Sequence, residues 1–526
     1  MAQTYFTPTI AKKNGVLFDD TGNYNGLDPI DLYRADAAYR PVEFTFEVDT
    51  TLDDGLPRFV IPLRQQSCNL RVFWGDGQRT ILTVGQGPGS DHTYAVGGTY
   101  QIATVGTMPD WTTLLGSTRD RKKITTVLEW GDNFNPGNFS WYDVDNLVTF
   151  DATGGPTYVG NELTGTFVGA DSINDDLSGW DVSGATSFNS VFRSAPAFND
   201  PSINSWSVSG VSSFLECFQF CPYNGSLLNW DATGATNMNN FASKGAFNGD
   251  ISNWTVSSVT DMQGAFAETT AFNRDISGWT VSSVRFMQLM FSRAAVFDID
   301  ISGWDVSSVE DMTSMFAASF LGETIFNKNL KSWDVSSCRS FRAMFQLTNY
   351  AGDVSEWKIN TSASINMRQM FNACPLFNSD VSTKVVNPGL PTQYTAWDMS
   401  QVTSLQEMFQ SSPVFNQPIG NWDTGNVTTM SEMFKSTAVF NQDISGWSIA
   451  SLVDAQDFLG SNGAFSTTNY DLLLDSTTGW ASQATIQNNV GTSFGTTQYT
   501  AGGNAEAGRN ILTGTYGWTI IDGGPV

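Results

Sequence analysis

The sequence repeats itself with a period of about 25 residues, and this repeat limits the possible fold more than any other feature. "FNRDISGWTVSSVRFMQLMF" begins at Phe272, and "FDIDISGWDVSSVEDMTSMF" begins at Phe297. A unit this short cannot bury an apolar face by itself, so successive units must share one continuous core. The repeat therefore predicts a stack of coils.

Two columns of aromatic residues give the register of the repeat. A Trp recurs in eleven units from Trp180 to Trp447, and a Phe follows each Trp about twelve residues later. Two Trp intervals are long, at 29 residues before Trp333 and 40 residues before Trp397. We expect the core of the stack to contain Trp254, Trp279, Trp304, Trp422, Trp447, Phe266, Phe291, Phe316 and Phe434.

Each unit is expected to contain a short strand and a short helical turn. The pattern I-x-x-W-x-V places apolar residues at alternate positions, as in a strand with one buried face. The pattern V-x-x-M-x-x-M-F places them three and four apart, as on one side of a helix. With strands of successive units paired in parallel, residues 160–465 are predicted to form a repeat solenoid.

Polar residues recur in columns as well, and structural roles are the simplest interpretation. An Asn follows the aromatic residue that opens most units, from Asn199 to Asn441, and we expect a ladder of Asn side chains that bonds to backbone groups. An Asp column is expected to close turns: Asp176, Asp250, Asp275, Asp300, Asp380 and Asp443. Calcium binding and a catalytic carboxylate pair are the alternatives for this Asp column. No other cofactor is expected.

The candidate binding residues lie on an acidic stripe and in the two long units. The outward position after each Trp supplies Asp305, Asp334, Asp398 and Asp423, which would line a polar sheet face or simply be solvated. The extra residues of the long units fall at residues 317–325 and 383–396. Lys384 and Tyr394 in the second insertion are candidates for contact with a sugar or a protein.

Residues 40–110 have a different pattern, with period-two alternation interrupted by Gly and Asp turns. "WGDG" from Trp74, "HTY" from His92 and "GTY" from Gly98 occur in that order. These motifs resemble the polycystic-kidney-disease-type (PKD-type) domain. The resemblance implies an all-β, immunoglobulin-like sandwich that acts as an extracellular spacer.

The repeat "FNxDISxWxVSSVxxMxxMF" resembles that of BspA-type leucine-rich-repeat surface proteins. The resemblance extends to "ITTVLEWGDNF" at residues 124–134 and to "TYGWTIIDGG" near the C-terminus. It implies a connector and N-terminal cap at residues 111–159 and a C-terminal cap at residues 466–526. It also implies display at a surface and binding without catalysis.

Composition argues against several functions. The 52 acidic and 26 basic residues give a net charge of −26, which repels nucleic acid and anionic membranes. Membrane insertion is not expected, because no long apolar stretch occurs. The five Cys residues form no CxxC motif, and His92 is the only His, with an expected role in packing. We therefore expect no enzyme, with a carbohydrate-active enzyme as a remote alternative.

The preferred functional hypothesis is a structural protein on the surface of a bacteriophage virion, as a fibre, a spike or a capsid decoration. Residues 1–39 fall outside the family pattern and lack an apolar signal segment, so we expect them to attach the chain to other virion proteins. The repeats would then contact a glycan or protein of the host surface, in several copies. The alternative is a bacterial cell-surface adhesin exported without a conventional signal peptide.

Overall fold

The computed structural model describes residues 43–63, 67–84, 90–108, 111–113, 120–131, 139–150, 155–156 and 163–526. The chain divides into two compact units. The N-terminal unit comprises residues 1–185 and 195–206, and the repeat unit comprises residues 186–194 and 207–526. The expected attachment arm at residues 1–39 lies outside the described residues.

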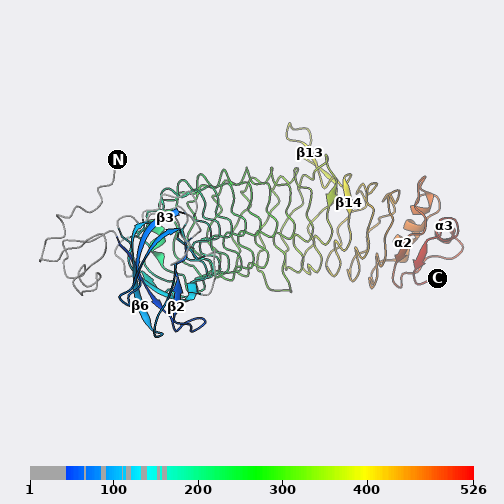
Figure 1. The fold of residues 1–526 in the computed structure, drawn as a ribbon. Coiled ribbons are helices and arrows are strands. Elements are labelled where there is room, and N and C mark those ends of the chain that lie inside the picture. The colour runs from blue at the N-terminus through cyan, green and yellow to red at the C-terminus, as the bar shows by residue number, and fades with distance from the viewer. Residues whose placement is uncertain are drawn as a thin grey trace, which may run out of the picture. The chain divides into compact units, whose positions relative to one another are not determined.

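The N-terminal unit is built on a six-stranded sheet with the order β10-β8-β1-β6-β3-β4 (Figure 1). Phe44, Phe46 and Val48 alternate along β1 and are buried, and the ring of Trp111 packs edge-on against both Phe rings. The described elements of this unit are β1 (Glu43–Asp49), β2 (Arg58–Val60), β3 (Ser67–Phe73), β4 (Arg79–Val84), β5 (Asp91–Thr93), β6 (Thr99–Thr107), β7 (Trp111–Thr112), η2 (Asp120–Lys123), β8 (Ile124–Glu129), β9 (Phe139–Ser140), β10 (Thr149–Phe150) and η3 (Pro201–Ser205).

This sheet continues past residue 110, the boundary that the sequence pattern suggested. Strand β8 pairs antiparallel with β1, and β10 pairs parallel with β8. Strand β1 lies between β6 and β8, and these two neighbours satisfy the backbone hydrogen-bonding groups on both of its edges. The segment expected to be a connector therefore supplies part of the sheet.

The "WGDG" and "HTY" motifs meet in one packed cluster. Gly75 and Gly77 have φ of +81° and +85°, and a Cβ on Gly75 would lie 2.6 Å from the carbonyl oxygen of Gln101. His92 stacks on Trp74, and its Nε2 lies 2.8 Å from Oδ2 of Asp76. His92 is 9% exposed, so it packs and forms a hydrogen bond as expected.

Successive coils of the repeat unit pair in parallel, mostly through single residues (Figure 1). The pairing column includes Ser187, Ser213, Asn237, Asp261, Phe286, Asp311, Ser340, Asn366, Ser404, Thr429 and Asp454. The elements of this unit are β11 (Ile365–Asn366), β12 (Lys384–Val386), β13 (Tyr394–Ala396), β14 (Val402–Ser404), α2 (Thr467–Leu474), η4 (Trp480–Ser482), β15 (Gly491–Ser493), α3 (Asn504–Gly514) and β16 (Thr519–Ile521).

The expected strand and helical turn within each coil are both wrong. Residues 207–465 are described throughout and contain no helix, and the I-x-x-W-x-V segment is not a strand. In one coil this segment forms two turns, because the N–H of Trp279 bonds to the carbonyl of Ile276 and that of Val284 bonds to Val281. The Oδ1 of Asp275 closes the first turn by accepting a hydrogen bond from the N–H of Ser277.

In the M-x-x-M-F segment, successive backbone N–H groups bond alternately to the next coil and within their own coil. The segment therefore does not form a helix. The N–H groups of Met262, Gly264 and Phe266 donate to carbonyls of the next coil, at 2.8–3.0 Å. The intervening N–H groups close turns within the coil. Glu268 has a left-handed φ of +58°, which costs about 1–2 kcal/mol in a residue with a side chain. The bonds between coils offset this cost.

Aromatic rings form stacked columns through the core of the repeat unit. Phe291 and Phe316 stack at a centroid distance of 5.8 Å, and Phe297 and Phe326 stack at 5.8 Å in a second column. Within one coil, Phe291 stacks on Phe297 at 3.9 Å. The nine Trp and Phe residues expected in the core are at most 4% exposed.

The Asn column forms the expected ladder along the stack. Oδ1 of Asn248 accepts the backbone N–H of Asn273, and Oδ1 of Asn273 accepts the N–H of Asp298. The same bond links Asn416 to Asn441 at 2.9 Å. Each side chain therefore satisfies a backbone donor of the next coil, which confirms the structural interpretation.

Residues 466–526 pack on the last repeat. The N–H of Leu459 bonds to the carbonyl of Ser493, and Phe494 lies edge-on to Phe458 at 6.1 Å. The indole ring of Trp480 is fully buried and lies 6.0 Å from the ring of Phe458. These contacts cover the end of the aromatic core.

Candidate binding surfaces of the repeat unit

The four Asp residues of the predicted acidic stripe lie in turns and not on a sheet face. Asp305, Asp334 and Asp423 are exposed, and Asp398 is half-buried. In each, Oδ1 accepts a hydrogen bond from the backbone N–H two residues later, at 2.9–3.1 Å. This bond closes a turn, so the recurring carboxylate has a structural role whether or not it also contacts a partner.

The second insertion, residues 383–396, forms a β-hairpin that projects from the stack (Figure 1). Its two candidate residues hold it in place. Nζ of Lys384 pairs with Oδ2 of Asp380 at 2.8 Å, and the Tyr394 hydroxyl donates to the carbonyl of Glu356 at 2.6 Å. The hairpin instead exposes the aliphatic side chains of Val385 and Leu390.

The contacts at the base of the hairpin change the pKa values of Asp380 and Tyr394. Partial burial raises the pKa of Asp380, but hydrogen bonds from Lys384 and Ser382 outweigh it, so the net pKa is lowered. Burial and the nearby carboxylate of Glu356 raise the pKa of the Tyr394 hydroxyl. At neutral pH the carboxylate of Asp380 is therefore ionised and the phenol of Tyr394 is neutral.

The first insertion, residues 317–325, exposes three apolar side chains together: Phe320, Leu321 and Ile325. Glu323 anchors this insertion loop, because Oε1 accepts from Nε of Arg293 at 2.9 Å and Oε2 accepts from the Ser319 hydroxyl at 2.9 Å. Although burial raises the pKa of Glu323, hydrogen bonds from the backbone N–H of Ser319, from Arg293 and from the Ser319 hydroxyl bring the net pKa below its usual value. The loop is thus a fixed structure with an apolar outer surface.

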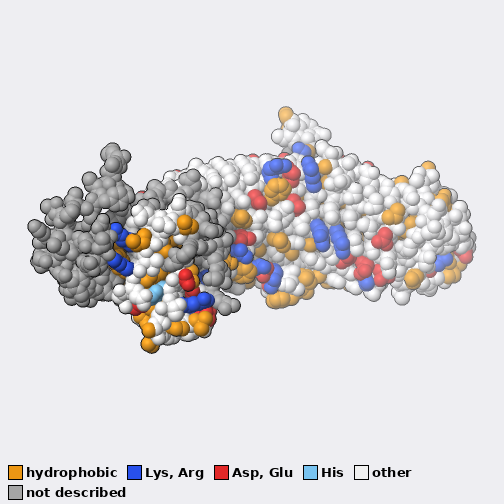
Figure 2. Space-filling model, in the orientation of Figure 1, with side chains coloured by type: hydrophobic (Ala, Val, Ile, Leu, Met, Phe, Trp, Pro, Cys, Tyr) orange, Lys and Arg blue, Asp and Glu red, His pale blue; other side chains and the backbone are white. Residues whose placement is uncertain are grey.

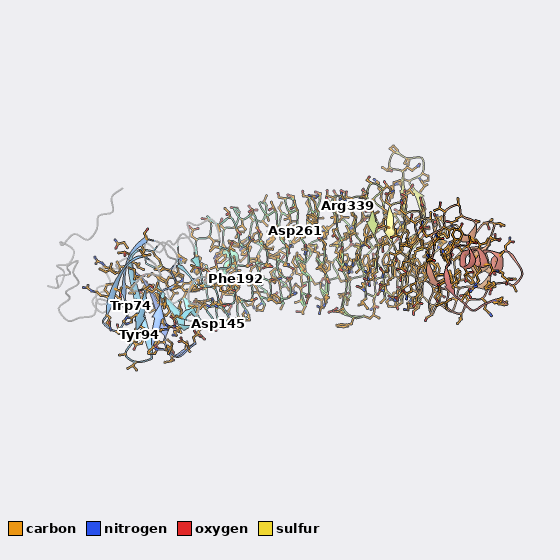
Figure 3. All side chains as sticks on the ribbon, turned by 45° about the vertical axis from the view of Figure 1, so that its right-hand side comes forward. Trp74, Tyr94, Asp145, Phe192, Asp261 and Arg339 are labelled. Atoms are coloured by element: carbon orange, nitrogen blue, oxygen red, sulfur yellow. The ribbon has the colours of Figure 1, made fainter. Side chains whose placement is uncertain are left out.

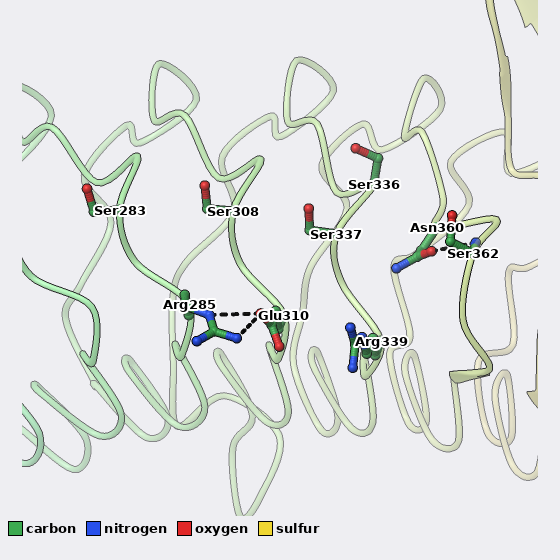
Figure 4. Close-up of a pocket in the computed structure, with 9 residues that line it drawn as sticks. All are labelled: Ser283, Arg285, Ser308, Glu310, Ser336, Ser337, Arg339, Asn360 and Ser362. Atoms are coloured by element: carbon green, nitrogen blue, oxygen red, sulfur yellow. Dashed lines mark hydrogen bonds and ion pairs between the residues drawn. The ribbon is translucent and has the colours of Figure 1, made fainter.

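A polar hollow of about 490 Å³ opens on the coils that precede the hairpin (Figure 4). We call it the arginine hollow. Its lining consists of Ser283, Arg285, Ser308, Glu310, Ser336, Ser337, Arg339, Asn360 and Ser362. Nε of Arg285 donates to Oε1 of Glu310 at 2.8 Å. Arg339 is exposed on the same side of the stack as Asp261 (Figure 3).

Sequence reasoning missed the charged residues of this hollow, although a signal was present. The position six residues after Trp is Thr or Ser in most units, as in Thr236, Thr260 and Thr428. Three consecutive units have Arg285, Glu310 and Arg339 instead. An alignment of the repeats against one another, rather than a search for their consensus, would have found this exception.

Charges of both signs are mixed over the visible face of the repeat unit, without a broad patch of one sign (Figure 2). In the described part of the chain, no three His, Cys, Asp or Glu side chains are placed to hold a metal ion together. Burial raises the pKa of the thiols of Cys221, Cys338 and Cys374 to about 12. These thiols are therefore poor nucleophiles at neutral pH.

None of the described helices has the length and apolar character needed to cross a membrane. A family model described as "Mycoplasma protein of unknown function, DUF285" matches the chain four times, at residues 157–243, 216–324, 317–389 and 383–484. These matches cover more than half of the 526 residues and coincide with the repeats. No curated protein and no solved structure matches the chain significantly.

Proposed function

The chain belongs to the DUF285 family, and from this premise we propose that it is a non-enzymatic surface-display protein whose repeats bind a partner. In this proposal the repeat unit is a BspA-like solenoid of the leucine-rich-repeat type. The parallel pairing of successive coils supports that assignment. The sheet of the N-terminal unit is a PKD-type, immunoglobulin-like spacer, supported by the cluster of Trp74, His92 and Tyr94.

The observation that carries this proposal is the apolar surface of the insertion loop. Phe320, Leu321 and Ile325 are 61%, 50% and 55% exposed, and they are neighbours in sequence. An exposed cluster of large apolar side chains is typical of an interaction site. Glu323 holds the loop in place before any partner binds, which reduces the entropy lost on binding.

A binding experiment tests this role of the loop. The double variant Phe320→Ser/Leu321→Ser should weaken the attachment of the purified, fluorescently labelled protein to bacterial cells by about tenfold or more, as for central apolar contacts. The matched control is Val414→Ser/Val439→Ser, which removes two exposed aliphatic side chains from regular coils. Equal attachment by both variants would remove the loop as the recognition element.

The hairpin provides a separate arm of the same test. Replacing residues 384–395 with a short Gly/Ser link should preserve the stack, because changes in loop length cost little. Thr383 stays in place, where its backbone carbonyl accepts a hydrogen bond from Nδ2 of Asn421. Reduced attachment by this variant would assign binding to the hairpin as well.

We place the protein on the outside of a bacteriophage virion, attached through residues 1–39 and present in several copies. The second candidate location is the bacterial cell surface, and the description of the family as Mycoplasma proteins favours it. Mass spectrometry of purified virions and of washed cell envelopes would distinguish the two. Detection in envelopes but not in virions would overturn the virion proposal.

Deleting residues 1–38 tests the attachment role. The shortened chain should keep a folded repeat unit and fail to join its assembly. Incorporation at normal occupancy would move the anchor elsewhere, with residues 466–526 as the next segment to delete. A carbohydrate-active enzyme is the remaining alternative, and release of reducing sugars from host glycans by the purified chain would support it.

A further inference from the structure

A ladder of hydroxyl groups runs along the regular coils and is interrupted at the arginine hollow. At the position six residues after Trp, Oγ1 of Thr260 donates to the carbonyl of Thr236 one coil earlier, at 3.2 Å. Thr428 makes the same bond to Thr403 at 3.0 Å. In three consecutive coils Arg285, Glu310 and Arg339 replace the hydroxyl residue. These three side chains do not form the hydroxyl-to-carbonyl bond of the ladder. The charged groups therefore mark this part of the stack as different from the regular coils.

The backbone holds the three charged residues in register. The N–H of Glu310 donates to the carbonyl of Arg285 at 2.8 Å, and the N–H of Arg339 donates to that of Glu310 at 2.9 Å. Each step is one coil, so the two Arg residues are about 9–10 Å apart along the stack. This distance is comparable to the length of a disaccharide.

The central carboxylate satisfies only one of the two guanidinium groups. Arg285 donates to Glu310 from both Nε and Nη2. Within the described residues, the guanidinium of Arg339 has no hydrogen bond or ion pair, and Figure 4 draws none from it to the other residues that line the hollow. A guanidinium offers two parallel donors that match a carboxylate. Arg339 is therefore the group in the hollow that is available to bind an anion.

Hydroxyl groups lie beside the charged row. Ser283, Ser308 and Ser337 occupy one column, one residue per coil (Figure 4). Within the described residues their hydroxyls take part in no hydrogen bond. Each hydroxyl is both a donor and an acceptor. A repeated row of this kind matches the hydroxyls of successive sugars.

We propose that the arginine hollow binds a glycan in which one carboxylate-bearing sugar lies among neutral sugars. Arg339 receives the carboxylate, and the row from Ser283 to Ser337 receives the sugar hydroxyls. The inference rests on the proposed function only in that the chain is a binding protein. It assigns the glycan to a different surface from the apolar insertion loop.

The surroundings of the hollow favour this ligand over its competitors. No lining residue is aromatic, so the hollow lacks the platform on which a neutral sugar ring stacks. Glu310 and the nearby acidic turns oppose a dense polyanion such as a nucleic acid, as does the net charge of −26. The charge of Glu310 is offset by its ion pair with Arg285, and acidic groups more than about 8–10 Å away are screened at physiological salt, so an isolated carboxylate is tolerated at Arg339.

The test uses the full chain and a soluble tetrasaccharide with a single uronic acid. Binding is followed by saturation-transfer NMR and calorimetry. Arg339→Gln should weaken binding at least about tenfold, the usual effect of losing a hydrogen bond to a charged group. The matched control is Arg342→Gln, which removes an exposed Arg from the same coil but outside the hollow. Arg342→Gln should leave the affinity unchanged.

Two further ligands identify the chemistry that is recognised. The same tetrasaccharide with its carboxylate reduced to an alcohol should bind at least tenfold more weakly to the unmodified chain. A peptide with one Glu should not bind. Equal binding of the reduced sugar, equal loss in both Arg variants, or preference for the peptide would each overturn the proposal. The Phe320→Ser/Leu321→Ser variant should keep its affinity for the tetrasaccharide, so failure at the loop and failure at the hollow are separable.

Discussion

The indole Nε1 of Trp279 donates a hydrogen bond to the backbone carbonyl of Ile251, one coil earlier, at 3.2 Å. Trp304 repeats this bond to Ile276, and Trp333 repeats it to Ile301, both at 3.1 Å. The Trp column therefore does two things. It fills the core, and it joins each coil to the preceding one through a polar contact.

Trp279→Ala should destabilise its own and the adjacent coils by about 3–5 kcal/mol, because it leaves a cavity in a closely packed core. Trp279→Phe keeps most of the ring but removes the indole hydrogen bond, while the carbonyl of Ile251 still accepts the backbone N–H of Trp254, so the cost should be only about 0.5–1.5 kcal/mol. Hydrogen exchange would measure both effects. Since repeat units couple mainly to their neighbours, equal loss of protection in β1 and β6 would contradict the prediction.

Asn416→Ala should weaken the Asn ladder, because Oδ1 of Asn416 accepts both the N–H of Asn441 and the amide of Gln442. We expect a loss of about 1–2 kcal/mol and faster exchange of the Asn441 amide. Asn416→Asp is the control, since Oδ1 of the naturally occurring Asp298 already accepts from Asn327. If Asp were as harmful as Ala at this position, the acceptor oxygen would not be the important feature.

The repeat unit should lose stability in acid because of its Asp turns. Hydrogen bonds from the hydroxyl and then the N–H of Ser277 lower the pKa of Asp275, and Thr233 does the same for Asp231. A pKa below that of the unfolded chain stabilises the fold above about pH 4, and this contribution is lost as the pH falls through the folded-state pKa. Urea midpoints measured between about pH 6 and pH 3 should therefore decrease. Asp275→Asn, which keeps the acceptor oxygen but does not titrate, should flatten that decrease slightly.

Lys123→Met should strongly destabilise the N-terminal unit. The Lys123 side chain is fully buried, and Nζ donates to Oδ1 of Asp54 and of Asp120, each at 2.8 Å. Asp120 is 2% exposed, so removing the ammonium group leaves a buried carboxylate uncompensated, at about 3–5 kcal/mol. Lys122→Met is the control, because Lys122 pairs with Asp145 near the surface, where a pair contributes about 1 kcal/mol or less. Amide exchange in β1 and β8 would decide, and similar effects of the two variants would count against the prediction.

Part of the candidate binding surface could be predicted from the repeat register alone. The register located both insertions, because extra residues between fixed Trp positions must leave the coil. It did not show that Tyr394 would use its hydroxyl to hold the hairpin to Glu356, or that Phe320 would face solvent. Those outcomes depend on the direction in which each loop leaves the stack.

The sequence by itself determined the period, the stacked arrangement and the aromatic core, because a 25-residue unit with Trp and Phe at regular positions can bury them only against its neighbours. It also predicted the Asn ladder, because an Asn that recurs at the same bend of successive units lies beside the equivalent residue of the adjacent coil. Only the tertiary structure decided where the coils pair, at Asp261 and Asp311 rather than around Trp279. Backbone bonding between coils outweighed the local pattern there. Likewise, Lys123 meets Asp54 across 69 residues, and Arg285, Glu310 and Arg339 meet across three coils. Such contacts depend on the spacing between paired backbones, which no local propensity encodes.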